Sequence, residues 1–296
     1  AWKQAQWTLL VQGVDLHDER VHALMQQFRF IPDARLDDVM ISYASDGGGV
    51  GPHFDSYDVF LLQAHGQRRW RIGRQKDRTL LPDMPVRILA DFQPEEEFVL
   101  NPGDMLYLPP GWAHDGVAVG ECMTYSIGFR VPQKGDLARD LLLRMAEPAA
   151  DALGESLYKD AGQPAVAQGA EIPDAMQQFA FGAVQAALLD ADNIACALGE
   201  YLTEPKANVW FDAPELEPTE LQTGGVRLDR RTRMLYDTHH IFINGESYRA
   251  AGKDARLMRQ LADDRALDAK AVARASEAAR ELMLSWVDAG WLLDGQ

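Results

Sequence analysis

Residues 51–55 have the sequence Gly51-Pro52-His53-Phe54-Asp55, and the preceding stretch Val39–Ser45 alternates like a β-strand. Residues 46–52, which are rich in glycine, have the composition of a loop between two strands. His53 and Asp55 are two residues apart, so on a strand that opens at His53 both side chains would project to the same face. The sequence therefore predicts a β-rich scaffold that directs an imidazole and a carboxylate at one point.

A third candidate ligand, His114, follows another recognisable unit. Residues 101–104 (Asn-Pro-Gly-Asp) predict a turn, Met105–Pro109 a short strand, and Pro110-Gly111 a second turn. This order is typical of double-stranded β-helix (cupin) barrels, which bring a late ligand beside an early pair. Two histidines and one carboxylate can hold iron(II) and leave the opposite positions open for a cosubstrate and oxygen. The alternative is a capping histidine at 53 and an ordinary loop histidine at 114.

Arg68 is the candidate for binding an anion inside the barrel. It follows a predicted turn at 64–67 and begins a predicted strand, 68–72, on which Arg69 and Arg71 face the opposite way. A planar guanidinium binds a carboxylate through two parallel hydrogen bonds, which suits the distal carboxylate of 2-oxoglutarate. The alternative is an exposed cation on a strand.

Alternation also separates a small or polar series of side chains from a bulky series on two strands. The small or polar series could line a cavity, and the bulky series predicts a packed layer. Asp38 would then need a cationic partner such as a substrate guanidinium, unless it is simply solvated at the strand start. The polar series is Asp38, Met40, Ser42, Thr124, Ser126 and Gly128, and the bulky series is Val39, Ile41, Tyr43, Tyr125, Ile127 and Phe129.

The stretch from Asp37 to Arg130 resembles the JmjC-type (cupin-4) 2-oxoglutarate oxygenases that hydroxylate ribosomal proteins, and within them the bacterial arginine hydroxylases. The likeness continues more weakly to the C-terminus. The eukaryotic relatives commonly have Lys at the position of Arg68, so the arginine favours the bacterial group. The motifs that carry the resemblance are Asp38–Ser42, Gly47–Asp55, Tyr57–Phe60, Arg68–Arg71, Pro102–Asp104, Pro109–Gly111 with His114, and Tyr125–Arg130.

This resemblance implies specific roles and a reaction. It implies iron(II) on His53, Asp55 and His114, and a salt bridge from Arg68 to 2-oxoglutarate. The implied product is a β-hydroxylated arginine in large-subunit ribosomal protein number sixteen, made with O2. The resemblance also implies a pocket for that arginine, built from Asp38, Met40, Tyr57 and Ser126.

Two other functions stay open. A related oxygenase could act on another target, as a histidyl hydroxylase or a lysine demethylase. A non-catalytic cupin could use the same barrel only to bind protein. The chain starts at Ala1 without Met, and the family's first barrel strands are expected upstream, so the sequence is expected to be part of a longer protein.

Composition limits the partners. The net charge is −16, which disfavours direct nucleic-acid binding and suits a basic ribosomal protein as substrate, although acidity can also serve solubility alone. Two cysteines fit a reducing cytoplasm. No apolar run reaches the length of a membrane span, so no membrane association is expected.

We expect an α+β protein with three parts: a catalytic barrel at 1–131, a helical region at 132–205 and a winged-helix-like domain at 206–296. Residues 136–145 and 175–202 predict amphipathic helices on either side of a Gly/Pro/Ala-rich stretch, 160–173. The family's counterpart forms a homodimer. The apolar residues here could serve that contact or an intramolecular core: Met176, Phe179, Phe181, Val184 and Leu188.

The last part predicts a linker at 214–223, then short strands at 226–228, 234–236 and 241–243, with Asn244-Gly245 as a tight turn. Helices are expected at 255–262 and 266–289. Because the net charge of this part is not basic, we expect a protein-contact or structural role.

Overall fold

Two compact units make up the chain, residues 1–131 and 132–296. The computed structural model describes residues 5–214, 221 and 224–294. Each unit has a hydrophobic core of its own. The linker predicted at 214–223 lies for the most part outside the described residues.

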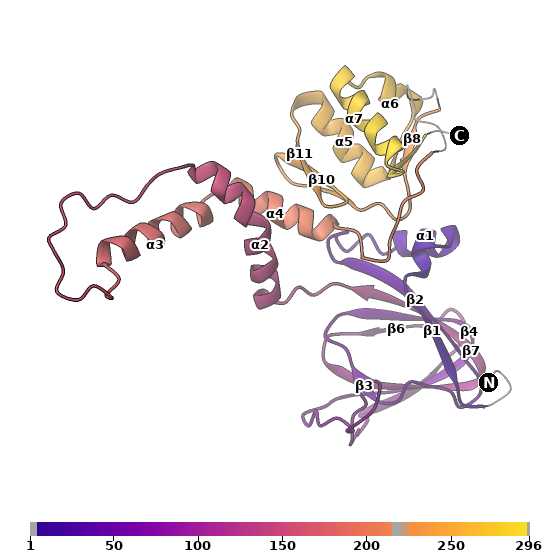
Figure 1. Ribbon diagram of the computed structural model, residues 1–296. Coiled ribbons are helices and arrows are strands. Elements are labelled where there is room, and N and C mark those ends of the chain that lie inside the picture. Colours follow the sequence, from indigo (N-terminus) through magenta and orange to yellow (C-terminus); the bar gives the residue numbers. More distant parts are fainter. Residues whose placement is uncertain (1–4, 215–220, 222–223, 295–296) are drawn as a thin grey trace. The chain divides into compact units, whose positions relative to one another are not determined.

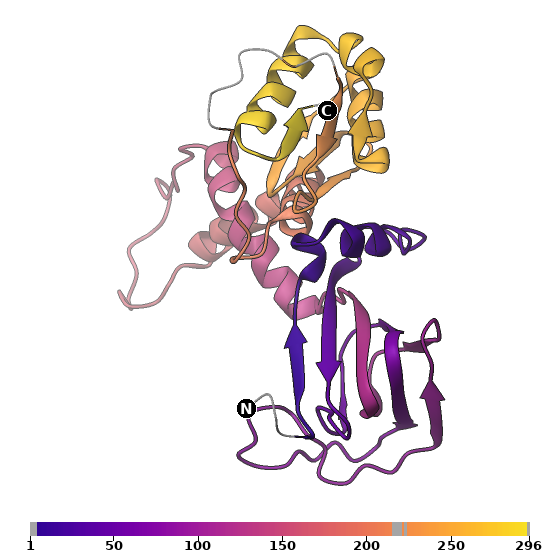
Figure 2. The ribbon, with the colours of Figure 1, turned by 90° about the vertical axis from the view of Figure 1, so that its right-hand side faces the viewer.

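The first unit is a β-structure with antiparallel pairing throughout. Its central order is β1-β2-β7-β4-β5, with β3 on β7 and β6 on β4. The strands wrap around a shared interior (Figures 1 and 2), and β1 and β5 remain edges, so the barrel is not closed among the described residues. The elements are β1 (Thr8–Val11), η1 (Val14–Leu16), α1 (Glu19–Gln26), β2 (Leu36–Ala44), β3 (His53–Phe54), β4 (Val59–Arg74), β5 (Glu96–Leu100), β6 (Met105–Leu108) and β7 (Trp112–Phe129).

The alternation of β2 and β7 separates two layers of side chains, as predicted. Val39, Ile127 and Phe129 belong to a core that also receives Val21 of α1. The opposite layer holds Ser42 and the residues paired with it across the sheet. There the register places Met40 beside Ser126, and Ser42 beside Thr124. The bulky series is therefore the packed layer, and the small or polar series faces the interior.

β4 corrects one expectation. The residues predicted as a turn, 64–67, do not reverse the chain, because β4 runs without interruption from Val59 to Arg74. Instead, its pairing with β7 shifts between Gln63 and His65 and again between His65 and Gln67. Such bulges change which positions face inward. The buried positions accordingly change from odd-numbered before the bulge to even-numbered after it: Val59, Leu61 and Gln63, then Arg68, Trp70 and Ile72.

The second unit opens with three helices, α2 (Lys134–Leu153), α3 (Asp174–Leu188) and α4 (Ala191–Thr203). The single helix predicted at 175–202 is wrong, because the Asp190 side chain accepts hydrogen bonds from the Asp192 and Asn193 amides and so starts a new helix. No helix in the described part of the chain is long and apolar enough to span a membrane alone. Only the pair α3 and α4 passes that test of length and composition, with a 60° bend between them.

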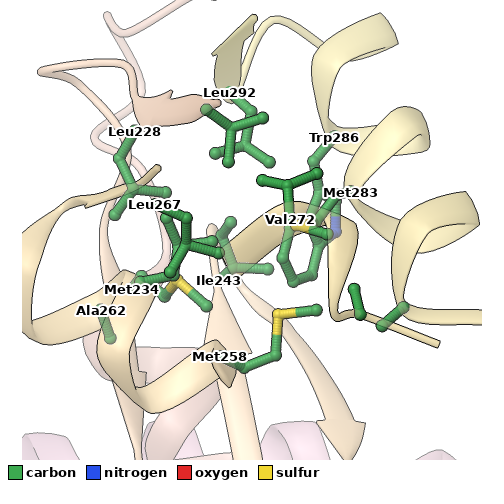
Figure 3. Close-up of a cluster of buried hydrophobic side chains, with 14 of the residues drawn as sticks. Leu228, Met234, Ile243, Met258, Ala262, Leu267, Val272, Met283, Trp286 and Leu292 are labelled. Carbon is green, nitrogen blue, oxygen red and sulfur yellow. The ribbon is translucent and has the colours of Figure 1, made fainter. Parts of the chain in front are cut away.

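The remaining elements form a compact sheet-and-helix module around one core (Figure 3). Its strands make two small antiparallel sheets, β11-β10-β9 and β12-β8-β13. Asn244 and Gly245 have φ angles of 48° and 90° and form the predicted tight turn between β10 and β11. The elements are β8 (Val226–Leu228), β9 (Met234–Tyr236), β10 (His240–Ile243), β11 (Glu246–Arg249), α5 (Gly252–Asp264), β12 (Ala266–Leu267), α6 (Ala269–Ala273), α7 (Glu277–Asp288) and β13 (Leu292–Asp294).

The long helix predicted at 266–289 is also wrong. Residues 266–267 form strand β12, and two shorter helices follow it. Asp268 accepts a hydrogen bond from the Ala271 amide, and Ser276 accepts one from the Ala279 amide. Each of these side chains caps the start of a helix, so the local capping preferences outweigh the continuous apolar pattern.

Candidate metal centre

Three potential ligands meet where β3 pairs with β7. His53 lies directly opposite His114 in that pairing, and their ring centroids are 4.3 Å apart. Asp55 lies just beyond the end of β3, not on the strand that the sequence predicted, yet its Oδ2 is 3.6 Å from Nε2 of His114. One ligand atom from each of the three residues lies within 4.8 Å of the other two. The chain therefore brings all three predicted ligands together.

Backbone carbonyls orient both imidazoles. Nδ1 of His53 lies 2.8 Å from the Gly51 oxygen, and Nδ1 of His114 lies 3.1 Å from the Trp112 oxygen. A carbonyl can only accept, so these contacts assign the proton to Nδ1 in each ring. Nε2 of each ring is then left with its lone pair, the form in which histidine binds a metal.

Burial keeps His114 neutral. Burial is the main cause that lowers the pKa of His114 to about 4, the neighbouring His53 lowers it further, and the hydrogen bond to Trp112 opposes the change. At neutral pH His114 is thus a neutral imidazole, and with His53 and Asp55 it makes a set of two histidines and one aspartate. This set fits the two-histidine, one-carboxylate triad of non-haem iron(II).

Arg68 occupies a buried inward position of β4 and is 3% exposed. Its Nη1 donates to the Gly116 oxygen at 3.4 Å and its Nη2 donates to the Ser42 hydroxyl at 3.3 Å, both long contacts to neutral acceptors. Its Nε is buried without an acceptor, and no ion pair found among the described residues includes Arg68. A buried guanidinium so weakly paired favours an anionic ligand, since an uncompensated buried charge is costly. The neighbouring Arg71 faces the other way and pairs with Asp115 at 2.5 Å.

Gln63 holds the bulge that turns Arg68 inward. Its side chain is fully buried, and its Nε2 donates to the carbonyls of His65 at 2.8 Å and Gly66 at 3.2 Å. Its Oε1 accepts from the Thr124 hydroxyl at 2.9 Å. Sequence reasoning missed Gln63, because a lone glutamine inside an apolar run carries no motif, although its polarity at a buried odd-numbered position was a signal.

The predicted substrate residues lie on the polar layer or beside the triad. Ser126 pairs with Met40 of β2 and with Leu61 of β4. Tyr57 is partly exposed, and its pKa is raised, first by burial and then by the charges of Asp55 and Asp38 and a hydrogen bond to Asp55. Asp38, Tyr57 and Asp55 are therefore close enough to interact. Binding of a substrate there remains a prediction.

Comparison with known proteins identifies two modules. A JmjC domain model matches residues 23–137, and a ROXA-like winged-helix model matches residues 186–293. The solved structure of YcfD from Escherichia coli superimposes with a TM-score of 0.84 at 28% identity, covering 99% of this chain and 81% of that one. Another YcfD structure, described as a ribosomal oxygenase in complex with cobalt and 2-oxoglutarate, has 30% identity and a TM-score of 0.79 and covers 97% and 78%. The chain belongs to the JmjC ribosomal oxygenase family.

This result confirms the resemblance and the fold class drawn from the sequence. A curated member of the JmjC ribosomal oxygenases, the ribosomal protein uL16 3-hydroxylase of Escherichia coli strain K12, is 42% identical over 173 residues. The match covers 57% of this chain and 45% of that relative, so the chain spans less than half of the curated protein it matches. The boundaries of the three expected parts, at 131 and 205, stay a prediction.

Proposed function

We propose that this chain is an iron(II)- and 2-oxoglutarate-dependent oxygenase that adds a β-hydroxyl group to an arginine of ribosomal protein uL16. The observation that carries the proposal is the convergence of His53, Asp55 and His114, with the buried Arg68 on the same inner layer. The likeness to a uL16 3-hydroxylase and to a ribosomal oxygenase that binds cobalt and 2-oxoglutarate supports it.

In this proposal His53, Asp55 and His114 hold the metal through two Nε2 atoms and a carboxylate oxygen. Arg68 binds the far carboxylate of 2-oxoglutarate and so fixes which end of the cosubstrate faces the metal. The bound metal, cosubstrate and oxygen supply the hydroxylation of a C–H bond, coupled to conversion of 2-oxoglutarate to succinate and CO2. The chain's own task is to orient these groups and to hold the target carbon beside them.

We assign the target side chain to the region around Tyr57, where three carboxylates act. Asp38, Asp37 and Asp55 all act on the pKa of Tyr57, so their negative charges reach a common region. A guanidinium entering there would be attracted by Asp38, while Met40 and Tyr57 would contact its aliphatic stem. Ser126 would offer a hydroxyl beside Met40. An arginine suits this combination better than a neutral imidazole does.

The partners and location follow from the same proposal. A net charge of −16 favours a basic protein as substrate and disfavours nucleic acid. Cys122 and Cys196 are unpaired, which suits the reducing cytoplasm where ribosomal proteins are made. We also propose a homodimer through α3, since α3 has no buried residue and its apolar side chains are exposed.

Mass spectrometry of uL16 tests the function. The substrate is incubated with the full chain, iron(II), 2-oxoglutarate and oxygen, and compared with His53→Ala and with His17→Ala, a control at an exposed histidine outside the site. One added oxygen on an arginine with wild type and His17→Ala, but not with His53→Ala, is the expected result.

Other outcomes of that experiment would change the assignment. If succinate forms without a modified arginine, the oxygenase stands but its target is a different side chain, such as a histidine or a methylated lysine. If neither product forms with metal-loaded protein, the proposed activity fails, and the result supports the alternative of a non-catalytic binding module.

A further inference from the structure

Trp70 lies between the two ends of the candidate site. It occupies the inward position next to Arg68 on β4 and is 6% exposed. Its ring centroid is 5.9 Å from that of His114 and 5.8 Å from Cζ of Arg68. The indole therefore reaches from a metal ligand at one end to the buried guanidinium at the other.

Gly116 allows the indole to take this place. Trp70 and Gly116 are direct partners across β4 and β7, and a Cβ at position 116 would lie 2.7–2.9 Å from three carbons of the six-membered ring. These three carbons form the edge of the indole that is opposite Nε1. The nitrogen edge consequently faces away from the β7 backbone at Gly116.

The N–H of Trp70 is a buried donor without an acceptor. The comparison with Trp286 is informative, because that indole is also buried but its Nε1 donates to the Tyr248 hydroxyl at 3.5 Å. Buried indole N–H groups usually find an acceptor, since an unpaired donor costs free energy. Nε of Arg68, two residues away on the same face, is buried and unpaired as well.

We propose that Trp70 is a second cosubstrate-binding residue, whose indole N–H donates to the carboxylate of 2-oxoglutarate that Arg68 also binds. Two unpaired donors on successive inward positions of β4 favour an acceptor with several lone pairs, and a carboxylate provides them. This inference rests on the proposed function and adds a residue to it. Gly116 would then matter in two ways, by its carbonyl contact to Arg68 and by leaving room for the indole.

The test measures binding rather than turnover. The full chain is loaded with Zn(II), which is diamagnetic, and titrated with 2-oxoglutarate by calorimetry and by NMR of the ¹⁵N-labelled indole groups. The chain has 7 tryptophans, and the Trp70 signal is the one missing from Trp70→Phe. We expect this signal to shift and its hydrogen exchange to slow, and we expect Trp70→Phe to weaken binding about tenfold.

Two further variants serve as references, one for loss of packing and one for loss of the cation. Phe98→Leu disturbs the same cluster across the strand pair but removes no polar atom, so its dissociation constant should stay within about twofold of wild type. Arg68→Met sets the scale for losing the main cationic partner. Thermal unfolding of each variant shows whether it is folded.

The outcomes are distinct. If wild type binds 2-oxoglutarate and the Trp70 signal neither shifts nor gains protection, the inference is overturned, whatever the variants do. If Trp70→Phe folds and binds as tightly as wild type, it is overturned too. If metal-loaded wild type does not bind 2-oxoglutarate at all, the proposed function itself fails.

Discussion

His53 and His114 are direct partners across β3 and β7, and this pairing places their ring centroids 4.3 Å apart although they are 61 positions apart in the chain. β3 has only two residues, so its position depends almost wholly on its bonds to β7. The same antiparallel register that forms the sheet therefore also brings the two histidines of the candidate metal centre together. Asp55 needs no strand of its own, because it follows β3 immediately.

Removing one imidazole should strongly weaken metal binding while leaving the sheet intact. We expect His114→Ala to lower the affinity for Co(II), a substitute for iron(II), by about 100-fold or more, because the loss of a direct ligand exceeds the effects known for groups behind the ligands. The control is His65→Ala, an exposed histidine on β4 of the same sheet. Calorimetric titration gives the constants, and unchanged Co(II) affinity in His114→Ala would rule out the assigned ligand set.

Asp38 should govern recognition of the target arginine but not of the cosubstrate. If Asp38 binds the target guanidinium as proposed, Asp38→Ala would remove a charge-assisted hydrogen bond, and kcat/KM for an arginine peptide should fall about 10- to 100-fold. The dissociation constant of 2-oxoglutarate should not change. Steady-state kinetics across a series of peptide concentrations separates KM from kcat.

A matched control for this change is the adjacent carboxylate. Asp37→Asn removes an equal charge, but the Asp37 carboxylate accepts a hydrogen bond from Arg130 at 3.3 Å. Its effect on kcat/KM should stay below about threefold, the range of a partly exposed charge pair. Equal losses in the two variants would mean that general acidity, and not Asp38 itself, recognises the substrate.

Replacing Gln63 should lower the free energy of unfolding by more than the loss of one hydrogen bond would. Gln63→Leu leaves the Thr124 hydroxyl and two carbonyls in the buried bulge without their partner, so the barrel unit should lose roughly 2–3 kcal/mol. Gln67→Ala, at an exposed position on the same strand, should change the free energy of unfolding by about 0.5 kcal/mol or less. Urea unfolding followed by a probe in the first unit measures both. A loss in Gln63→Leu no larger than in Gln67→Ala would contradict the role of the bulge.

The β-bulge at Gln63 is a feature that could not be predicted from the sequence. The convergence of His53, Asp55 and His114 and the two layers of β2 and β7 could be predicted, because local motifs and strict alternation determine them. The inward direction of Arg68 could not be derived from alternation. Odd-numbered residues of β4 are buried before the bulge and even-numbered residues after it, and the bulge depends on a hydrogen bond between Gln63 and the distant Thr124. The helix breaks at Asp190 and Ser276 were missed for a related reason. There, capping side chains outweigh an apolar pattern that continues across them.

Asp229 should make the stability of the second unit depend on pH. Burial by itself raises the pKa of this carboxyl, but hydrogen bonds from the side chain and backbone of Arg231 outweigh burial and hold the pKa below its ordinary value of 3.8. Because the folded-state pKa is the lower one, the stabilisation is fully present above the unfolded-state pKa. It is lost as the pH falls below about 4 through the folded-state value.

Denaturant unfolding at pH 7 and at pH 3 detects this linkage. The wild type should lose more stability on acidification than Asp229→Asn, which cannot titrate at this position. Asp212→Asn is the control, because Asp212 also contacts Arg231 at 3.0 Å but is 76% exposed. It should leave the pH dependence close to that of the wild type. If Asp229→Asn loses as much stability between pH 7 and pH 3 as the wild type does, Asp229 is not the source of the pH dependence.

The exposed face of α3 should hold two copies of the chain together. Phe181 and Val184 are 63% and 60% exposed, which excludes an intramolecular core as the role of these apolar side chains among the described residues. Large exposed apolar surfaces mark interaction sites, and a second α3 offers a matching apolar surface. Introducing charge with Phe181→Asp and Val184→Asp should therefore convert a dimer to a monomer in sedimentation velocity. Val99→Asp, an equally drastic change at an exposed valine of β5, should leave the dimer intact. If wild type sediments as a monomer at micromolar concentration, the proposed homodimer fails.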